Sequence, residues 1–235
     1  MEGEMLQSGW YNKSVELGRV APSLIFAEMT PPRPACPAKS PLCNALSTND
    51  NDWVLPLKIG DDFFLTTDNP VYLEFDPTTL SASKWEFSSG DLPTPALNMI
   101  NMGAAHTVPR VDDPDTYIGV ALSEPDLMSG EGTLFVYEIS SKDTRSRRLL
   151  NSVKLPLNYF PYIHAFGLTE NNVVVSFQPV TMHLGIENLL KGTMMSAIRG
   201  YKDQRGIASS LAVVPLDGSE TAIFPMETPQ WSIHV

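Results

Sequence analysis

Short runs of alternating apolar and polar residues cover much of the chain after residue 52. A period of two is typical of β-strands that bury one face. Turn-forming pairs such as Asp-Pro and Asp-Gly separate many of the runs. Gly60-Asp61, between the first two, predicts a tight hairpin. The predicted strands are 53–59, 62–67, 71–75, 117–122, 133–139, 162–168, 172–178, 209–216 and 231–235.

One segment, 185–198, has apolar residues at helical spacing and is the predicted short helix. The 20 prolines and 15 glycines are scattered throughout, which opposes longer helices. Many short strands with little helix indicate a sandwich, a barrel or a propeller. No linker divides the chain. We therefore expect an irregular N-terminal part, 1–52, followed by one β-rich unit, 53–235.

The composition, with 43% hydrophobic and 18% charged residues, is that of a globular protein. The formal net charge of −11 argues against a nucleic-acid partner, because binding phosphates requires a basic surface. The one dense basic stretch, at Arg145, Arg147 and Arg148, is interpreted as a solvated turn. An apolar or neutral substrate suits this charge better than a phosphorylated one.

Three of the four histidines are candidate metal ligands. His106 follows a run of small residues, whereas His164 and His234 have apolar neighbours among which a histidine without a partner would be costly to bury. The gaps between them are each about the length of one large propeller blade. If each lay on an inner strand, the three imidazoles could converge on one axial metal. His183 opens the predicted helix, where a capping or surface role is expected.

The stretch YIHAFGLTENNVV, 162–174, resembles the carotenoid oxygenase family. The hallmark of this family is an iron-ligating histidine followed by an apolar-Gly-apolar-Thr-Glu-Asn run and a buried strand. The segments AAH, 104–106, and WSIHV, 231–235, are similar to its first and third ligand motifs. TTDN, 66–69, is similar to a strand end that carries a carboxylate hydrogen-bonded to a ligand. The resemblance covers about residues 50–235.

The resemblance implies an all-β fold that is part of a seven-bladed β-propeller, truncated at both ends, with a short helical segment. It implies Fe²⁺ bound by His106, His164 and His234, with Asp68 accepting a hydrogen bond from a ligand imidazole. The implied activity is cleavage of a carbon–carbon double bond of a carotenoid or apocarotenoid by O₂, with no catalytic residue beyond the metal ligands. The implied partners are an apolar polyene and O₂. The segment 184–198 matches a family patch for peripheral membrane contact, with a core-facing amphipathic helix as the alternative.

Several departures from the family pattern keep other interpretations open. Thr107 stands where a proline is usual, and Asp68 is one methylene shorter than the usual glutamate. The family has a fourth ligand histidine, which has no counterpart here, so the fragment itself is expected to be inactive. The alternatives are a relative that isomerises retinoids or cleaves stilbenoids, and a non-catalytic propeller fragment. The localisation, whether a plastid or the cytoplasmic face of a membrane, stays open.

Overall fold

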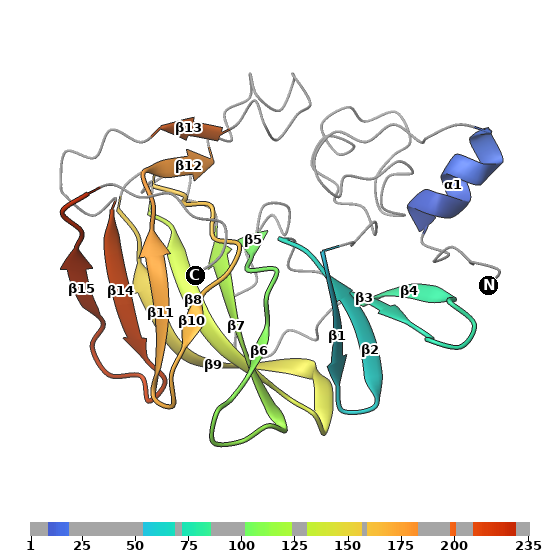
Figure 1. Ribbon diagram of the computed structural model, residues 1–235, viewed down its shortest axis with the longest axis horizontal. Helices are drawn as coiled ribbons and strands as arrows, with labels where there is room; N and C mark the ends of the chain where they lie inside the picture. Colours follow the sequence, from blue (N-terminus) through green and yellow to red (C-terminus); the bar gives the residue numbers. More distant parts are fainter. Residues whose placement is uncertain are drawn as a thin grey trace.

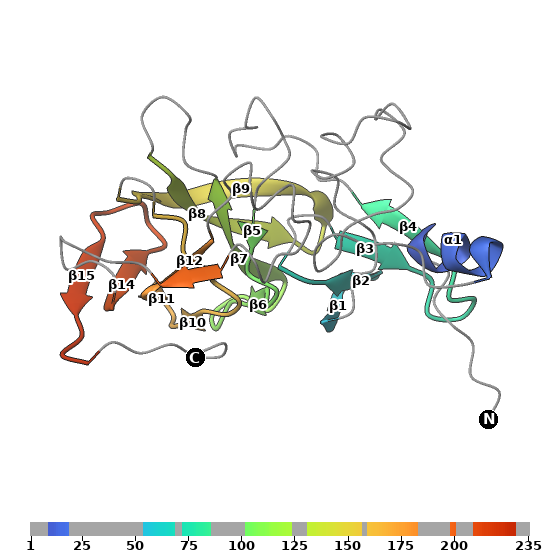
Figure 2. The same ribbon diagram turned by 90° about the horizontal axis from the view of Figure 1, so that it is seen from above.

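The computed structural model describes residues 9–18, 54–68, 72–85, 102–123, 131–156, 159–182, 198–200 and 209–228. In this part of the chain, one helix, α1 (Gly9–Leu17), accompanies three larger antiparallel sheets and one two-stranded ladder. Figure 1 shows the three sheets side by side, with the second between the first and the third. Figure 2 gives the same arrangement from above.

Each larger sheet is built mainly from hairpins, so strands that follow one another in sequence are usually neighbours. The first sheet has the order β1 (Leu55–Ile59), β2 (Asp62–Thr66), β3 (Tyr72–Phe75), β4 (Ala82–Trp85). The second has β5 (Met102–Gly103), β7 (Thr116–Ser123), β8 (Thr133–Ser140) and β9 (Asp143–Lys154), with β6 (Val108–Pro109) also paired to β7. The third has β10 (Gly167–Leu168), β11 (Asn172–Phe177), β14 (Ser210–Pro215) and β15 (Ala222–Pro225).

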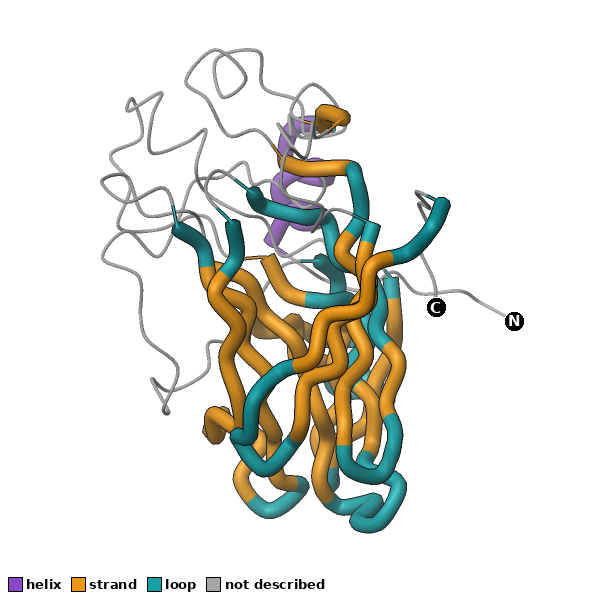
Figure 3. The backbone as a smooth tube through the Cα atoms, turned by 90° about the vertical axis from the view of Figure 1, so that its left-hand side faces the viewer, coloured by secondary structure: helices purple, strands orange, loops and turns teal. Residues whose placement is uncertain are grey.

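The strands β12 (Val180–Met182) and β13 (Ile198–Gly200) pair with each other and lie above the third sheet in the view of Figure 1. Figure 3 shows that several hairpin turns of the larger sheets gather at one end of the molecule. No helix in the described ranges combines the length and the apolar character that crossing a bilayer requires.

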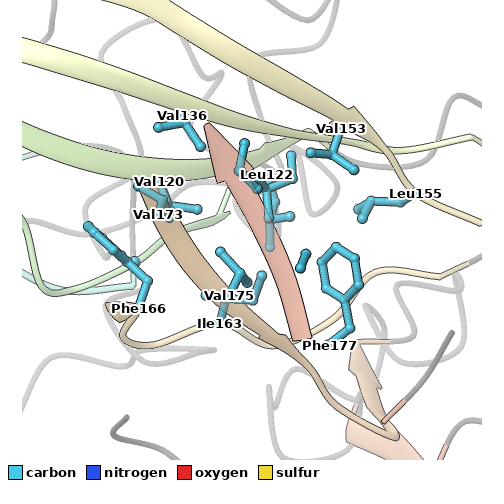
Figure 4. Close-up of a cluster of buried hydrophobic side chains, with 14 of the residues drawn as sticks. Val120, Leu122, Val136, Val153, Leu155, Ile163, Phe166, Val173, Val175 and Phe177 are labelled. Carbon is cyan, nitrogen blue, oxygen red and sulfur yellow. The ribbon is translucent and has the colours of Figure 1, made fainter. Parts of the chain in front are cut away.

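The main core lies between the second and third sheets. It consists of alternate, inward-facing residues of both, as the period of two predicts. Burial of such aliphatic side chains contributes about 1.5–3 kcal/mol each. Figure 4 shows this packing, with Val120, Leu122 and Val136 of the second sheet close to Val173, Val175 and Phe177 of the third.

The opposite face of the second sheet packs on the first sheet. Ile59, Phe64 and Tyr72 of the first sheet cluster there with Ala121, Tyr137 and Ile139 of the second. Strand β7 is therefore covered on both faces, and residues 118–122 are all buried. This explains why the sequence of β7 is almost continuously apolar rather than alternating.

The hairpin between β1 and β2 makes a close contact with the second sheet. Gly60 has a φ of +59°, and a Cβ at this position would lie 2.4 Å from the carbonyl oxygen of Ser141. Both facts require glycine. Next to it, the Thr144 hydroxyl donates to Asp62 Oδ2 at 2.6 Å. The predicted Gly60-Asp61 turn is thus confirmed, and it helps to dock the first sheet on the second.

Most of the alternating runs are strands in the structure, but three expectations about secondary structure are wrong. Arg145, Arg147 and Arg148 lie within strand β9 and not in a turn. There the guanidinium of Arg147 lies over the ring of Tyr137, with its carbon 5.3 Å from the ring centre, and Arg148 pairs with Glu138 at 2.6 Å. Within 162–168 only β10 is a strand, and α1 was not predicted at all. The predicted strand 231–235 lies outside the described residues, and so does the predicted helix 185–198 except for Ile198, which belongs to strand β13.

Candidate metal centre

His106 lies where the edge strand of the second sheet is interrupted. Strands β5 and β6 both pair with β7, through Met102 and Leu122 at one end and Val108 and Ile118 at the other. Residues 104–107 between them leave the regular ladder. The amide of Ala104 still donates to the carbonyl of Val120 at 2.9 Å. The segment that carries His106 is therefore a short bulge set into a strand edge.

The first sheet holds this bulge in place through three hydrogen bonds. The hydroxyl of Thr66 donates to the carbonyl of Ala105 at 2.6 Å. The hydroxyl of Thr107 is hydrogen-bonded to that of Tyr72, and both residues are buried. The amide of Gly103 donates to the carbonyl of Asp68 at 3.0 Å. The backbone on both sides of His106 is thus fixed by side chains and backbone of another sheet.

His164 lies in an irregular extended segment that leads into β10, the edge strand of the third sheet. Ile163 and Phe166 are buried in the main core. Tyr162 also packs against this core, but its hydroxyl and the Nδ1 atom of His164 face Asp68. The chain bends at His164, so this division does not follow the strict alternation of a regular strand. The core residues thereby anchor the segment and leave His164 facing the first sheet.

The motif that follows His164 forms the turn into the next strand. The amide of Asn172 donates to the hydroxyl of Thr169 at 3.0 Å, and the amide of Thr169 donates to the carbonyl of Asn172 at 2.9 Å. Gly167 pairs with Val174, and Leu168 pairs with Val173. The conspicuous Thr-Glu-Asn run therefore closes the β10–β11 hairpin directly after the histidine segment.

Asp68 connects the two histidine segments. Its Oδ1 atom lies 2.8 Å from Nδ1 of His164, and the hydroxyl of Tyr162 donates to its Oδ2 atom at 2.7 Å. The side chains of His164 and Asp68 are 9% and 12% exposed, so water screens this contact little. Because Asp68 occupies Nδ1, a metal held by His164 would be bound through Nε2.

Burial dominates the electrostatics of this contact. Burial raises the pKa of the Asp68 carboxyl above its usual value, while the hydrogen bonds from Tyr162 and His164 partly oppose the rise. Burial and the neighbouring Asp68 charge together raise the pKa of Tyr162. Tyr162 therefore keeps its proton and acts as a donor to Asp68.

The rings of His106 and His164 are adjacent although they come from different sheets. Their centres are 5.1 Å apart and their planes are inclined by 69°. Two imidazoles that share one ion at metal–nitrogen distances of about 2.1 Å would have ring centres roughly 4.5–5.5 Å apart. The Nε2 atom of His106 is buried. The pair therefore fits two positions of an all-imidazole metal site.

The structure brings together some of the predicted site residues and does not describe the others. The structure places His106, His164 and Asp68 close together, whereas His234 and His183 lie outside the described residues. Within the part described, no cluster of three or more histidine, cysteine or acidic side chains is arranged to hold a metal. Two contacts that hold the site residues in place were not predicted: the hydrogen bond from Tyr162 to Asp68 and the Tyr72–Thr107 hydrogen bond. A tyrosine two residues before the histidine was the available signal for the first.

Comparison with known proteins identifies the family. The model of the RPE65 family, described as retinal pigment epithelial membrane protein, matches residues 5–235. The chain belongs to this family. The resemblance to carotenoid oxygenases drawn from the sequence motifs is thereby confirmed.

Known members of the RPE65 family and their structures agree with this assignment. The β,β-carotene 15,15'-dioxygenase of Rattus norvegicus is 25% identical over 199 residues, which cover 76% of this chain and 32% of that protein. A Glu150Gln mutant of the Synechocystis apocarotenoid oxygenase matches with a TM-score of 0.68 at 16% identity, over 98% of this chain and 45% of that one. The cobalt-substituted Synechocystis enzyme matches with a TM-score of 0.64, 16% identity, and 95% and 43% coverage.

The fold of this RPE65-family chain is thus the predicted all-β propeller, and the three larger sheets belong to it. The chain spans about a third of the curated relative and less than half of these solved chains. It therefore corresponds to part of the propeller that these structures contain.

Proposed function

We propose that this protein functions as a non-haem iron dioxygenase that cleaves a carbon–carbon double bond of a carotenoid or apocarotenoid. The observation that carries the proposal is the convergence of His106 and His164, at 5.1 Å between ring centres, beside the Asp68 carboxylate. His234, predicted from the sequence motif, is proposed as a third ligand. A set of neutral imidazoles suits a ferrous ion and leaves positions for other molecules.

The protein's own residues have three tasks in this proposal. His106 and His164 supply nitrogen ligands from two sheets. Asp68 accepts the Nδ1 proton of His164, which fixes the tautomer and increases the electron density at Nε2. Thr66 and the Tyr72–Thr107 pair hold the His106 segment and thereby limit how far the two imidazoles can move apart.

When bound, a ferrous ion supplies the chemistry by which dioxygen adds to a double bond and yields two carbonyl products. The substrate proposed is an apolar polyene. The match to proteins named as a carotene dioxygenase and an apocarotenoid oxygenase supports this class, as does the acidic chain, which lacks a phosphate-binding motif. Membrane contact through 184–198 would give access to such a substrate and remains a sequence-based proposal.

Product analysis under ¹⁸O₂ tests this function. The chain is loaded with Fe²⁺ without oxygen and offered β-carotene, an apocarotenal, a stilbenoid and a retinyl ester in separate micelles. We expect ¹⁸O in carbonyl products of a carotenoid or apocarotenal from whichever protein carries the complete set of ligand histidines, and none from the same protein with His164→Ala. A longer version that includes the sequence after Val235, if one exists, is assayed in parallel. Conversion of the retinyl ester alone, without oxygen uptake, would instead indicate the isomerase alternative. If neither protein converts any of the four, the dioxygenase proposal fails.

A further inference from the structure

We infer that Tyr162 is a positioning residue for the metal site and acts through Asp68 on His164. The inference rests on the proposed iron site and extends it to a residue to which neither the motifs nor the comparisons assign a role. Tyr162 itself reaches no metal in this proposal. Its contribution is the orientation of the carboxylate that orients the ligand.

Each of the two side-chain oxygens of Asp68 has its own partner. Oδ1 contacts Nδ1 of His164 at 2.8 Å, and Oδ2 accepts from the Tyr162 hydroxyl at 2.7 Å. A short aspartate held at one oxygen could rotate about its terminal torsion, which is broad for this side chain. Held at both oxygens, it has one orientation. The imidazole of His164 then has a fixed partner on its Nδ1 side.

Tyr162 also lies directly against the ring of His164. The two rings are nearly parallel, inclined by 27°, with centres 6.2 Å apart. The Tyr162 hydroxyl lies 3.4 Å from Nδ1 of His164, on the side of the ring that faces Asp68. The three side chains therefore form a closed triangle, and a shift of one moves the other two.

Separate parts of the backbone position Asp68 and the Tyr162–His164 pair. Tyr162 and His164 are on one segment, whose position is set by Ile163 and Phe166 in the core. Asp68 is fixed from the other side, because its carbonyl accepts from the amide of Gly103 at 3.0 Å. The Tyr162 side chain thus connects the segment before the third sheet to Asp68 after the first, next to the proposed ligand His164.

The test is a double-mutant cycle on metal affinity with Tyr162→Phe and Asp68→Ala in the full chain. Affinity is measured for Fe²⁺ without oxygen and for Co²⁺ by its visible absorption. Partners behind a ligand histidine typically contribute 10–100-fold to metal affinity, so we expect Tyr162→Phe to bind roughly 10-fold more weakly. In the Asp68→Ala background the same substitution should cause a much smaller loss, because only the direct contact with the His164 ring is left.

Tyr159→Phe is the matched control. Tyr159 lies three residues before Tyr162 in the same segment. Its hydroxyl donates to the carbonyl of Gln178 at 2.8 Å and not to Asp68. It should lower thermal stability and leave metal affinity unchanged. An equal loss of affinity in Tyr159→Phe, or a loss from Tyr162→Phe that is the same in both backgrounds, would assign Tyr162 a merely structural role.

A metal-independent measurement covers the case in which Tyr162→Phe does not fold. Incorporation of 3-fluorotyrosine at position 162 keeps the ring and the hydroxyl, and its ¹⁹F resonance should shift on Asp68→Ala. An unchanged resonance overturns the inference. Equal affinities of the unsubstituted chain and Tyr162→Phe overturn the inference alone. Absence of saturable metal binding by the unsubstituted chain overturns the inference and the proposed iron site together.

Discussion

Asp68 and His164 are 96 residues apart in the sequence, and their side chains meet at 2.8 Å in a nearly dry space between sheets. The contact joins the end of β2 in the first sheet to the segment before β10 in the third. Such a contact stabilises little by itself, because burial penalises the carboxylate charge. Its use lies in fixing which nitrogen of His164 faces the candidate metal site.

We therefore expect Asp68→Asn to weaken metal binding without lowering the stability of the fold. Burial raises the pKa of Asp68, so above that pKa the folded chain holds a charge that it disfavours. The stability of the metal-free chain should fall as the pH rises from the ordinary value of 3.8 through the raised pKa, because the folded state binds the proton more tightly. Asp68→Asn should lack this fall and be at least as stable at neutral pH, yet bind Fe²⁺ about 10–100-fold more weakly.

Urea unfolding at several pH values and an anaerobic iron titration measure the two effects. A variant that loses stability at neutral pH and keeps its iron affinity would reverse both expectations. It would show that Asp68 is a structural residue without influence on the metal.

The Tyr72–Thr107 hydrogen bond should contribute to stability as a pair. Thr107→Val keeps the side-chain shape but removes the hydroxyl that contacts the buried Tyr72. Loss of one partner of a buried hydrogen bond costs about 1–3 kcal/mol. Loss of both, in Tyr72→Phe with Thr107→Val, should cost less than the sum of the single changes. Chemical denaturation of the four chains checks this, and additive losses would refute the pairing.

Gly119 should tolerate no side chain, because Tyr137 lies against it. A Cβ on Gly119 would approach Cζ of Tyr137 to 2.4 Å, and the Tyr137 ring is itself buried against the first sheet. We expect Gly119→Ala to lower the free energy of unfolding by about 1–3 kcal/mol through overpacking. Gly167→Ala is the control, since its Cβ would meet only Val174, at an ordinary 3.6 Å. Thermal unfolding that ranks the two variants equally would contradict this packing.

The sequence predicts those strands that bury one face, because packing imposes the alternation that is read from it. β11 and β14 are examples, with regular alternation of buried and half-buried residues. β9 was missed because its sequence, DTRSRRLLNSVK, is mostly polar. Its structure comes from pairing with β8, which a local pattern does not reveal. β5 and β6 have two residues each, too few for any period.

In the candidate site, too, some residues could be predicted from the sequence and others could not. His106, His164 and Asp68 could be predicted because they lie in motifs shared with a known family. Tyr162 was within the quoted motif, but its role depends on a bond to a residue in another sheet. The Tyr72–Thr107 pair connects positions 35 apart, and one of the two departs from the family pattern. Contacts of this kind follow from how the sheets dock, which single-sequence reasoning does not supply.

The most direct test of the account is the stoichiometry of Fe²⁺ bound without oxygen by the unsubstituted chain, His106→Ala, His164→Ala and His183→Ala. Because the first two histidines are proposed to share one ion, either substitution should abolish high-affinity binding while circular dichroism shows the fold retained. His183→Ala should bind like the unsubstituted chain. Equal iron content in all four proteins would contradict the proposed metal centre.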